Sequence, residues 1–194
     1  GYRYTTLDAA VRRSAEVDDC LGARYPMCTI DGDETCAVWQ HGDLEIHVSA
    51  AVAYGIWHYD KVIGDKSLLY GEGIEILIEV CRYYATRGQY SQLNGDFGYW
   101  NVMGPDEFHM QCHNNAYTNV MAKRMFEYTL EVIEEMKKAA PKELAAAKKK
   151  RNLKPAEMKD WAEKARKMRT QYDRKTERSE EHTSELQSLF IISY

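Results

Sequence analysis

The stretch from Glu45 to about Ile63 is apolar on almost every side, and it constrains the fold more than any other part of the sequence. Its apolar residues leave little room for a polar face: Ile46, Val48, Ala51, Val52, Tyr54, Ile56, Trp57, Tyr59 and Val62. A helix with this pattern is expected to be buried on every side. We therefore predict that this segment lies in the inner layer of a helical protein.

Apolar residues at helical spacing predict several further helices. These cover residues 4–15, 67–87 and 119–139, and another begins at Pro155. The polar face of the second is predicted to point outward, with Glu72, Glu75, Glu79 and Arg82. The chain has 194 residues, 44% of them hydrophobic, which is enough for one globular domain. The predicted fold class is all-α, built from antiparallel helix pairs.

Two long segments without helical periodicity are predicted to be loops. Residues 22–43 contain glycine and proline at several points, and residues 101–115 have no periodicity at all. Between the helices, Asn94-Gly95 marks a tight turn of the kind found in a β-hairpin. Long ordered loops on a rigid scaffold tend to carry function. Both loops are therefore candidate positions for a functional site.

Charge and composition exclude several classes of protein. The formal net charge is −4, and the lysines and arginines cluster only late in the chain, so nucleic acid is not an expected partner. No run approaches the roughly 18 apolar residues of a membrane helix, so we expect a soluble protein with no membrane partner. Five cysteines without zinc or disulfide spacing indicate reduced thiols in a cytoplasmic protein.

The two ends of the chain suggest an internal fragment with an added tail. The sequence opens at Gly1 and is at once in an apolar and aromatic pattern. Residues 178–188 read RSEEHTSELQS, which resembles the translation of a sequencing-library adapter. We therefore expect residues 1–177 to be a fragment of a natural domain, which the resemblance described below would make catalytic, and residues 178–194 to be an adapter-derived or disordered tail.

The segment from Gly104 to His109 has the composition of an active-site loop. It places Asp106 and Glu107 between a chain-breaking Gly-Pro and Phe108. A glutamic acid beside an apolar ring can stay protonated near neutral pH, as general-acid cleavage of a glycosidic bond requires. The same spacing also suits a helix N-cap followed by a solvated glutamate. Spacing alone leaves both interpretations open.

Other residue types suggest metal binding or sugar stacking. His109 and His113 are four apart, but no third ligand is evident, so no metal is expected. Flat aromatic rings can stack on a sugar; Trp39 and Tyr25 on the first loop are better candidates than Trp57, which is expected in the core. A Cys112–His113 nucleophile pair is disfavoured, because neighbours in sequence rarely face each other.

Several motifs taken in order identify a resemblance. They read YRYTTL, GARYPM, WQHGDLEIHVSAAVAYGIW, GEGIEILIEVCRYYATR, VMGPDEFH and HNNAYTNVMAK. Together they resemble glycoside hydrolase family 65, which contains maltose, kojibiose, nigerose and trehalose phosphorylases. The resemblance runs from Tyr2 to about Thr176.

This resemblance implies a fold, a reaction and a set of site residues. The fold would be an (α/α)6 barrel, here only partial and truncated at both ends. The reaction would be inverting phosphorolysis of an α-linked glucose disaccharide to β-glucose 1-phosphate, with Glu107 as general acid. The co-substrate would be inorganic phosphate, with no other cofactor. The residues expected to bind substrate are Trp39, Gln40, His41, Glu45, His47, Tyr25, Asp106 and Asn115.

The resemblance leaves alternatives that the sequence does not decide between. Family motifs that hold the donor glucose and the phosphate are absent from this stretch, so the 194-residue chain is itself expected to be inactive. An inverting hydrolase on the same scaffold and a non-catalytic helical binding module are the competing hypotheses. A homodimer is one expectation for the parent protein. Neither the disaccharide nor its linkage follows from the sequence.

Overall fold

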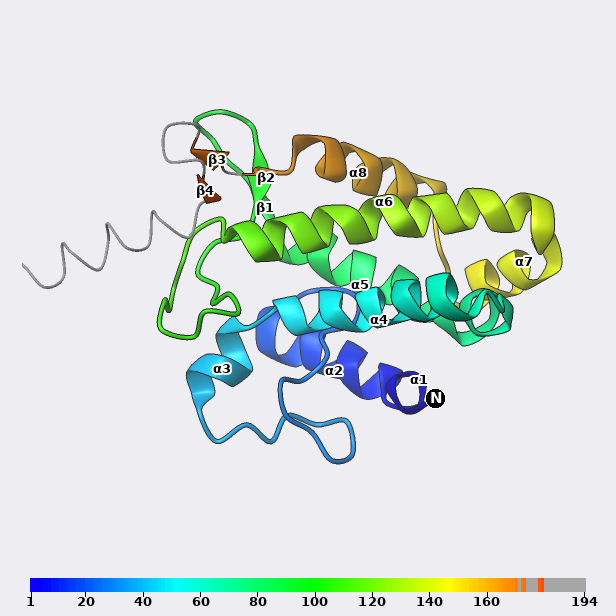
Figure 1. The fold of residues 1–194 in the computed structure, drawn as a ribbon, viewed down its shortest axis with the longest axis horizontal. Coiled ribbons are helices and arrows are strands. Elements are labelled where there is room, and N and C mark those ends of the chain that lie inside the picture. Colours follow the sequence, from blue (N-terminus) through cyan, green and yellow to red (C-terminus); the bar gives the residue numbers. More distant parts are fainter. Residues whose placement is uncertain (171, 174–177, 180–194) are drawn as a thin grey trace, which may run out of the picture.

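The computed structural model describes residues 1–170, 172–173 and 178–179, and within this part of the chain the fold is all-α with two short hairpins (Figure 1). The helices in chain order are α1 (Tyr2–Thr5), α2 (Leu7–Asp18), α3 (Trp39–Leu44), α4 (His47–Ile63), η1, a π-helical turn (Leu69–Gly73), α5 (Ile74–Arg87), α6 (Ala116–Ala139), α7 (Pro141–Lys150) and α8 (Pro155–Lys167). The strands are β1 (Gln89–Tyr90), β2 (Phe97–Gly98), β3 (Tyr172–Asp173) and β4 (Arg178–Ser179). The predicted fold class is confirmed.

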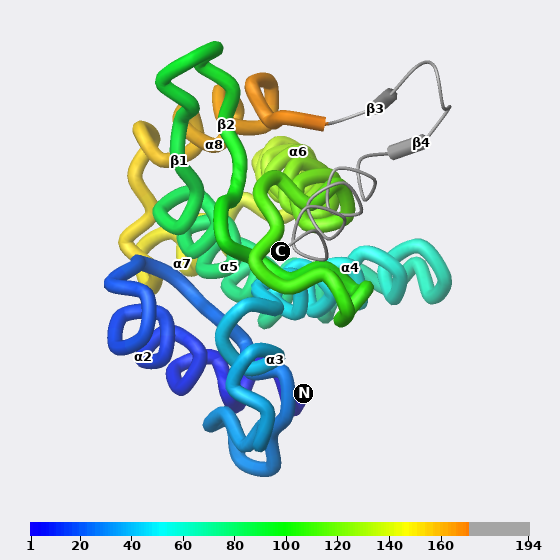
Figure 2. Tube along the Cα trace, turned by 90° about the vertical axis from the view of Figure 1, so that its left-hand side faces the viewer, coloured from blue at the N-terminus to red at the C-terminus, as the bar shows by residue number. Residues whose placement is uncertain are grey.

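The long helix α6 organises the packing. It contacts α4, α5 and α8, while α2 packs against α5 on the other side (Figures 1 and 2). The apolar spacing that predicted this helix runs through Met121, Met125, Tyr128, Val132 and Met136, and all of these are buried except Met121, which is half-buried. On α8 the predicted inward residues Trp161 and Ala165 are also buried. The core therefore lies between these helices.

Helix α4 is not buried on every side, which corrects the sequence-based expectation. One face, with Ala50, Ala53 and Ile56, is part of the core. Other positions of the helix are exposed, among them the large apolar residues Tyr54, Tyr59, Val62 and Ile63. Trp57 is half-buried against the core. The described residues thus cover only one side of a helix whose sequence is apolar all round.

Helix α5, together with the turn η1 that precedes it, is the more enclosed element. Eleven of its residues are buried, including Glu75 and Glu79, which were predicted to face outward. Glu75 accepts hydrogen bonds from Arg151, Lys150 and Tyr4 at 2.8 to 3.0 Å. Burial raises the pKa of Glu79, and Arg82, 2.8 Å away, opposes that shift. The outward prediction was wrong for these two residues because charged partners compensate the buried carboxylates, from the end of α7 for Glu75 and from α5 itself for Glu79.

Helix α7 was not predicted, because its sequence is rich in alanine and lysine and has little apolar contrast. Pro141 is its first residue, a position where the missing N–H is not needed. Only Leu144 and Ala147 of this helix are buried.

The turn at Asn94-Gly95 joins β1 to β2 as an antiparallel hairpin, as predicted. The strands β3 and β4 also pair antiparallel, with Asp173 opposite Arg178. The domain boundary expected after residue 177 therefore lies between two paired strands, and the rest of the proposed tail, residues 180–194, lies outside the described residues. Among the described helices, none is long and apolar enough to cross a membrane.

Candidate active site

The short helix α3 places the first candidate residues, in a segment that was predicted to be a loop. It begins at Trp39 and carries Gln40 and His41 in its first turn. Two buried arginines hold its end: Arg13 donates to the carbonyl of Gly42 at 2.7 Å, and Arg24 donates to those of Gly42 and Asp43 at 3.0 and 2.6 Å. The last carbonyls of a helix carry partial negative charge, so these cations stabilise its C-terminus.

The second group of candidates lies on the loop 101–115. Its two ends are joined by a pair of backbone hydrogen bonds between Val102 and Cys112, at 3.0 and 2.7 Å. The N–H of Met103 donates to the carbonyl of Leu44 at 2.9 Å, which fixes the loop against the end of α3. A Cβ added to Gly104 would lie 2.4 Å from Nδ2 of Asn115, so only glycine fits beside that side chain.

Helix α3 and the loop 101–115 bring three ionisable side chains together. Glu107 Oε1 lies 3.9 Å from Nδ1 of His41, which in turn lies 3.8 Å from Oε1 of Glu45. Ligating atoms of all three residues lie within 4.8 Å of one another. His47 joins the group, with its Nε2 atom 3.7 Å from Oε2 of Glu45. The structure thus unites four residues that the sequence analysis proposed.

Burial shifts the pKa values of Glu45 and His47 in opposite directions. Burial raises the pKa of Glu45, the charge of Glu107 raises it further, and His41 opposes the shift. Burial lowers the pKa of His47, against the hydrogen bond of its Nδ1 to the carbonyl of Met103 at 3.2 Å. The Oε1 atom of Glu45 is buried and has no hydrogen-bond partner in the structure. A buried polar atom of this kind is a position at which a ligand hydroxyl can bind.

The environment of Glu107 differs from the one expected. The ring of Phe108 is 94% exposed, and the Glu107 side chain is 47% exposed. Phe108 therefore does not form an apolar pocket around the carboxyl group. The acidic neighbour Glu45 and the imidazole of His41 are the groups that face Glu107 in the described part of the chain.

The remaining candidates have separate positions. Trp39 is 58% exposed at the start of α3, with Gln40 half-buried beside it. Tyr25 is only 1% exposed and donates its hydroxyl to the carbonyl of Arg3 at 2.7 Å. Its ring is therefore a core element and not a free stacking surface, which corrects its assignment as a sugar-stacking residue.

Asp106 and Asn115 support the loop. Asp106 accepts from Nδ1 of His109 at 2.5 Å and from the N–H of Phe108 at 3.1 Å, and these bonds lower its pKa. Asn115 is buried at the N-cap of α6 and accepts from the N–H of Thr118 at 3.0 Å. The N-cap role was considered for Asp106, but the structure gives it to Asn115.

The two histidines of the loop 101–115 have different hydrogen-bond partners. His109 is bonded to Asp106, whereas Nδ1 of His113 accepts from the N–H of Asn101 at 3.2 Å. Within the described residues, two other groups have metal-ligand spacing: His41 with Glu45 and Glu107, and Cys28 with Glu34 and Cys36. The thiol of Cys112 donates to the carbonyl of His109 at 3.0 Å.

An apolar cavity of about 150 Å³ lies between α4 and α6. None of the residues grouped around Glu107 lines it. Its lining includes Ala50, Trp57 and Met125, and Arg124 is its one charged residue. Such a lining offers few hydrogen bonds to a sugar, which carries hydroxyl groups on most of its carbons. The cluster around Glu107 is therefore the better candidate for carbohydrate chemistry.

Comparisons with known proteins agree on the class of protein. A model of the glycosyl hydrolase family 65 central catalytic domain matches residues 1–188. The kojibiose phosphorylase of Caldanaerobacter subterraneus subsp. tengcongensis is 37% identical over 185 residues, covering 89% of this chain and 24% of that protein. The α,α-trehalose phosphorylase of Thermoanaerobacter brockii is 38% identical over 174 residues, covering 89% and 22%.

A solved structure assigned as a kojibiose phosphorylase from the human microbiome superposes with a TM-score of 0.83 at 35% identity. That match covers 92% of this chain and 23% of the other. The chain thus spans about a quarter of the length of the relatives that it matches. These relatives are named for different disaccharides although they share this segment.

Proposed function

Because the chain belongs to glycoside hydrolase family 65, we propose that it is part of the catalytic domain of an enzyme that cleaves an α-linked glucose disaccharide by phosphorolysis. Its all-α fold is a part of the (α/α)6 barrel of this family. Relatives named as kojibiose, α,α-trehalose and maltose phosphorylases support this reaction class over simple hydrolysis.

Glu107 is the proposed general acid. Its carboxyl proton would pass to the glycosidic oxygen as the bond from that oxygen to the anomeric carbon breaks. An oxygen of inorganic phosphate would attack the same carbon from the opposite face, giving β-glucose 1-phosphate and the free acceptor sugar. Phosphate is already an anion, so no protein base is needed. The enzyme would then require no cofactor other than this co-substrate.

The neighbours of Glu107 have proposed roles in binding and protonation. Burial raises the pKa of Glu45, and its buried Oε1 atom, which has no hydrogen-bond partner in the structure, can accept a hydrogen bond from a sugar hydroxyl. His41 stands between the two carboxyl groups, and Trp39 offers an exposed ring on the same helix. These residues would bind the acceptor sugar.

The convergence of Glu107, His41 and Glu45 within 4.8 Å carries the proposal. Two segments far apart in sequence each contribute to this group, and each is fixed by backbone hydrogen bonds. A non-catalytic binding module gives no reason for a carboxyl group to be held beside a second, buried one. An inverting hydrolase remains the alternative, and it needs a carboxylate base about 6.5 to 9.5 Å from the acid.

The test uses the full-length parent enzyme and its Glu107→Gln variant. Loss of an essential general acid should lower turnover of an unactivated disaccharide by roughly 10²- to 10⁴-fold. α-Glucosyl fluoride, whose leaving group needs little protonation, should retain most of its reactivity with phosphate. Equal losses on both substrates would exclude the acid role, and product formation that is independent of phosphate would favour the hydrolase.

The 194-residue chain by itself is proposed to be inactive. It holds about a quarter of the length of its relatives, which are the proteins whose names describe the complete reaction. Incubating it with maltose, kojibiose or trehalose and phosphate should release no glucose 1-phosphate. Measurable release would show that the described residues suffice for the reaction.

A further inference from the structure

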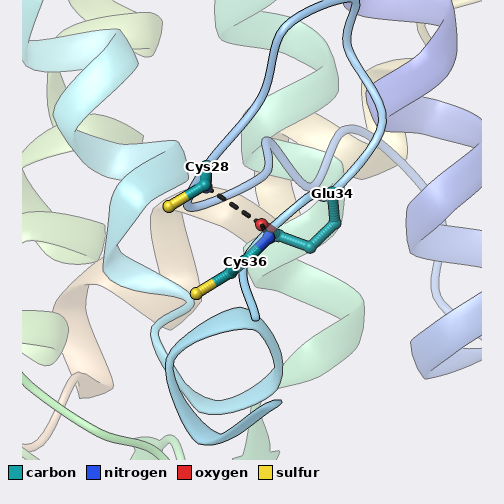
Figure 3. Close-up of side chains that lie close together, drawn as sticks. All are labelled: Cys28, Glu34 and Cys36. Atoms are coloured by element: carbon teal, nitrogen blue, oxygen red, sulfur yellow. Dashed lines mark hydrogen bonds between the residues drawn. The ribbon is translucent and has the colours of Figure 1, made fainter. Parts of the chain in front are cut away.

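Two cysteine thiols lie close together on the loop that precedes α3. Cys28 and Cys36 lie with Glu34 in a group whose sulfur and carboxylate oxygen atoms are all within 4.8 Å of one another. Figure 3 shows both sulfur atoms on one side of the loop, while the Glu34 side chain enters from the other. The N–H of Thr35 donates to the carbonyl of Cys28 at 2.9 Å and holds the two arms of the loop together.

Glu34 shapes this loop from within. Its Oε1 atom accepts from the N–H groups of Cys28 and Cys36 at 2.9 and 3.1 Å. Its Oε2 atom accepts from the N–H of Met27 at 2.7 Å and is paired with Arg13 at 3.0 Å. A carboxylate has about four lone-pair positions, and here all four have donors. Glu34 therefore has little capacity left to bind a metal, although its position beside two thiols resembles a metal site.

The two thiols are also the accessible ones. Cys28 is exposed and Cys36 is half-buried, whereas Cys20, Cys81 and Cys112 are buried. Burial raises the pKa of Cys81 to about 12, which suppresses its reactive thiolate form. The neighbouring Cys36 thiol raises the pKa of Cys28, so the reactivity of this pair depends on its exposure and on the closeness of the two sulfur atoms, not on a lowered pKa. Accessibility and proximity thus coincide at a single pair.

We propose that Cys28 and Cys36 are a reversible redox modification site that reacts with low-molecular-weight disulfides. The Cys28 thiol loses its proton and attacks one sulfur of the reagent, so that a mixed disulfide forms and one thiol leaves. The Cys36 thiolate then attacks Cys28 Sγ, forming the intramolecular bond and releasing a second thiol. Overall, the two cysteines lose two hydrogen atoms and two electrons, which reduce the reagent disulfide to two thiols.

The bond would fix the segment that leads into the candidate site. Two residues separate Cys36 from Trp39, where α3 begins. Glu34 already holds the loop to Arg13, and Arg13 also binds the end of α3. The modification is therefore expected to stiffen the approach to α3, and its chemistry does not depend on which reaction the parent enzyme catalyses.

The test equilibrates the purified chain with mixtures of reduced and oxidised glutathione, followed by acid quenching, alkylation and peptide mapping. We expect a Cys28–Cys36 link, alkylated Cys20, Cys81 and Cys112 after denaturation, and full reversal by dithiothreitol. The equilibrium constant for the link should be about tenfold higher in buffer than in guanidinium chloride, because the folded loop holds the thiols together. The variants Cys28→Ser and Cys36→Ser should each stop at a mixed disulfide.

A matched pair of variants examines the role of Glu34. Glu34→Gln should lower the equilibrium constant several-fold towards its denatured value, because an amide loses the pairing with Arg13 and two acceptor positions. Asp33→Asn, at an exposed neighbour paired only with Arg12, should leave it unchanged. Three results would overturn the proposal. The chain without substitutions could stop at a stable mixed disulfide, or the equilibrium constant of the Cys28–Cys36 link could be the same with and without denaturant. The two thiols could also form a stoichiometric Zn²⁺ complex that blocks their oxidation.

Discussion

The Nδ1 atom of His41 lies 3.9 Å from the Oε1 atom of Glu107, although the two residues belong to segments separated by three helical elements. His41 is fixed through α3, whose end is held by Arg13 and Arg24. Glu107 is fixed through the loop that donates from Met103 to Leu44. The geometry of the candidate site therefore depends on residues that do not belong to it.

Arg24 is predicted to be essential for the fold around α3. It is buried and paired with Asp18 at 2.8 Å as well as with two backbone carbonyls. Arg24→Ala would leave Asp18 and both carbonyls without this partner, which should lower the free energy of unfolding by about 3 to 5 kcal/mol. The control Arg12→Ala removes an exposed pair with Asp33 and should change it by less than about 1 kcal/mol. Chemical denaturation measures the free energy of unfolding of both variants. If Arg24→Ala lowers it as little as Arg12→Ala does, Arg24 does not anchor α3.

Glu45→Gln is predicted to change stability in a pH-dependent way. The pKa of Glu45 is raised in the folded chain above its unfolded value of about 4.3. Below a pH of about 4.3 Glu45 is protonated in both the folded and the unfolded chain, so its ionisation does not lower the stability. As the pH rises through the folded pKa, the unfolded state ionises more readily and stability falls. The variant should therefore raise the thermal unfolding midpoint near pH 7 and leave it nearly unchanged at pH 4. A gain at both pH values would point to packing instead of ionisation.

Much of the fold follows from the sequence because helical periodicity reports burial directly. The segments that became α2, α5, α6 and α8 were all identifiable in this way. Helix α3 was missed because six residues with one glycine give no periodic signal. Helix α7 was missed because alanine favours a helix without marking a buried face.

The candidate site was less predictable from residue types than from motifs. The grouping of His41, Glu45 and Glu107 depends on how two distant loops approach each other, which no local pattern contains. Tyr25 and Trp39 have the same aromatic signal in sequence, yet one is buried and the other exposed. Nor does an isolated arginine show whether it is an anchor such as Arg24 or a surface residue such as Arg12. Long-range packing decides each of these cases.

Gly104→Ala is predicted to displace the loop that carries Glu107. The added Cβ would lie 2.4 Å from Nδ2 of Asn115, a buried side chain that also caps α6. Either the loop or the cap must move, and loss of the cap alone costs about 1 kcal/mol. Gly55→Ala is the control, since a Cβ there meets no atom within 4 Å in the middle of α4. It should stabilise the helix by about 0.5 to 1 kcal/mol. If both variants unfold at the same midpoint, the contact between Gly104 and Asn115 has no energetic importance.

The exposed face of α4 supports a last prediction about the 194-residue chain. Tyr54, Tyr59, Val62 and Ile63 leave large apolar side chains of α4 exposed to water. At about 25 cal/mol per Å² of apolar surface, several hundred Å² left in water forgo on the order of 10 kcal/mol, which is comparable with the stability of a domain. The chain should therefore bind a hydrophobic dye and tend to self-associate at high concentration.

Substitution on that face distinguishes an uncovered surface from a core position. In the 194-residue chain, Val62→Lys should reduce dye fluorescence while changing the free energy of unfolding by less than about 0.5 kcal/mol. In the full-length parent, where further helices of the barrel are expected to cover α4, the same change should destabilise by several kcal/mol, because it would bury an unpaired charge. Ile56→Lys, on the face already packed in the core, should be strongly destabilising in both proteins. A Val62→Lys chain that loses its fold while Ile56→Lys keeps it would reverse the assignment of the two faces.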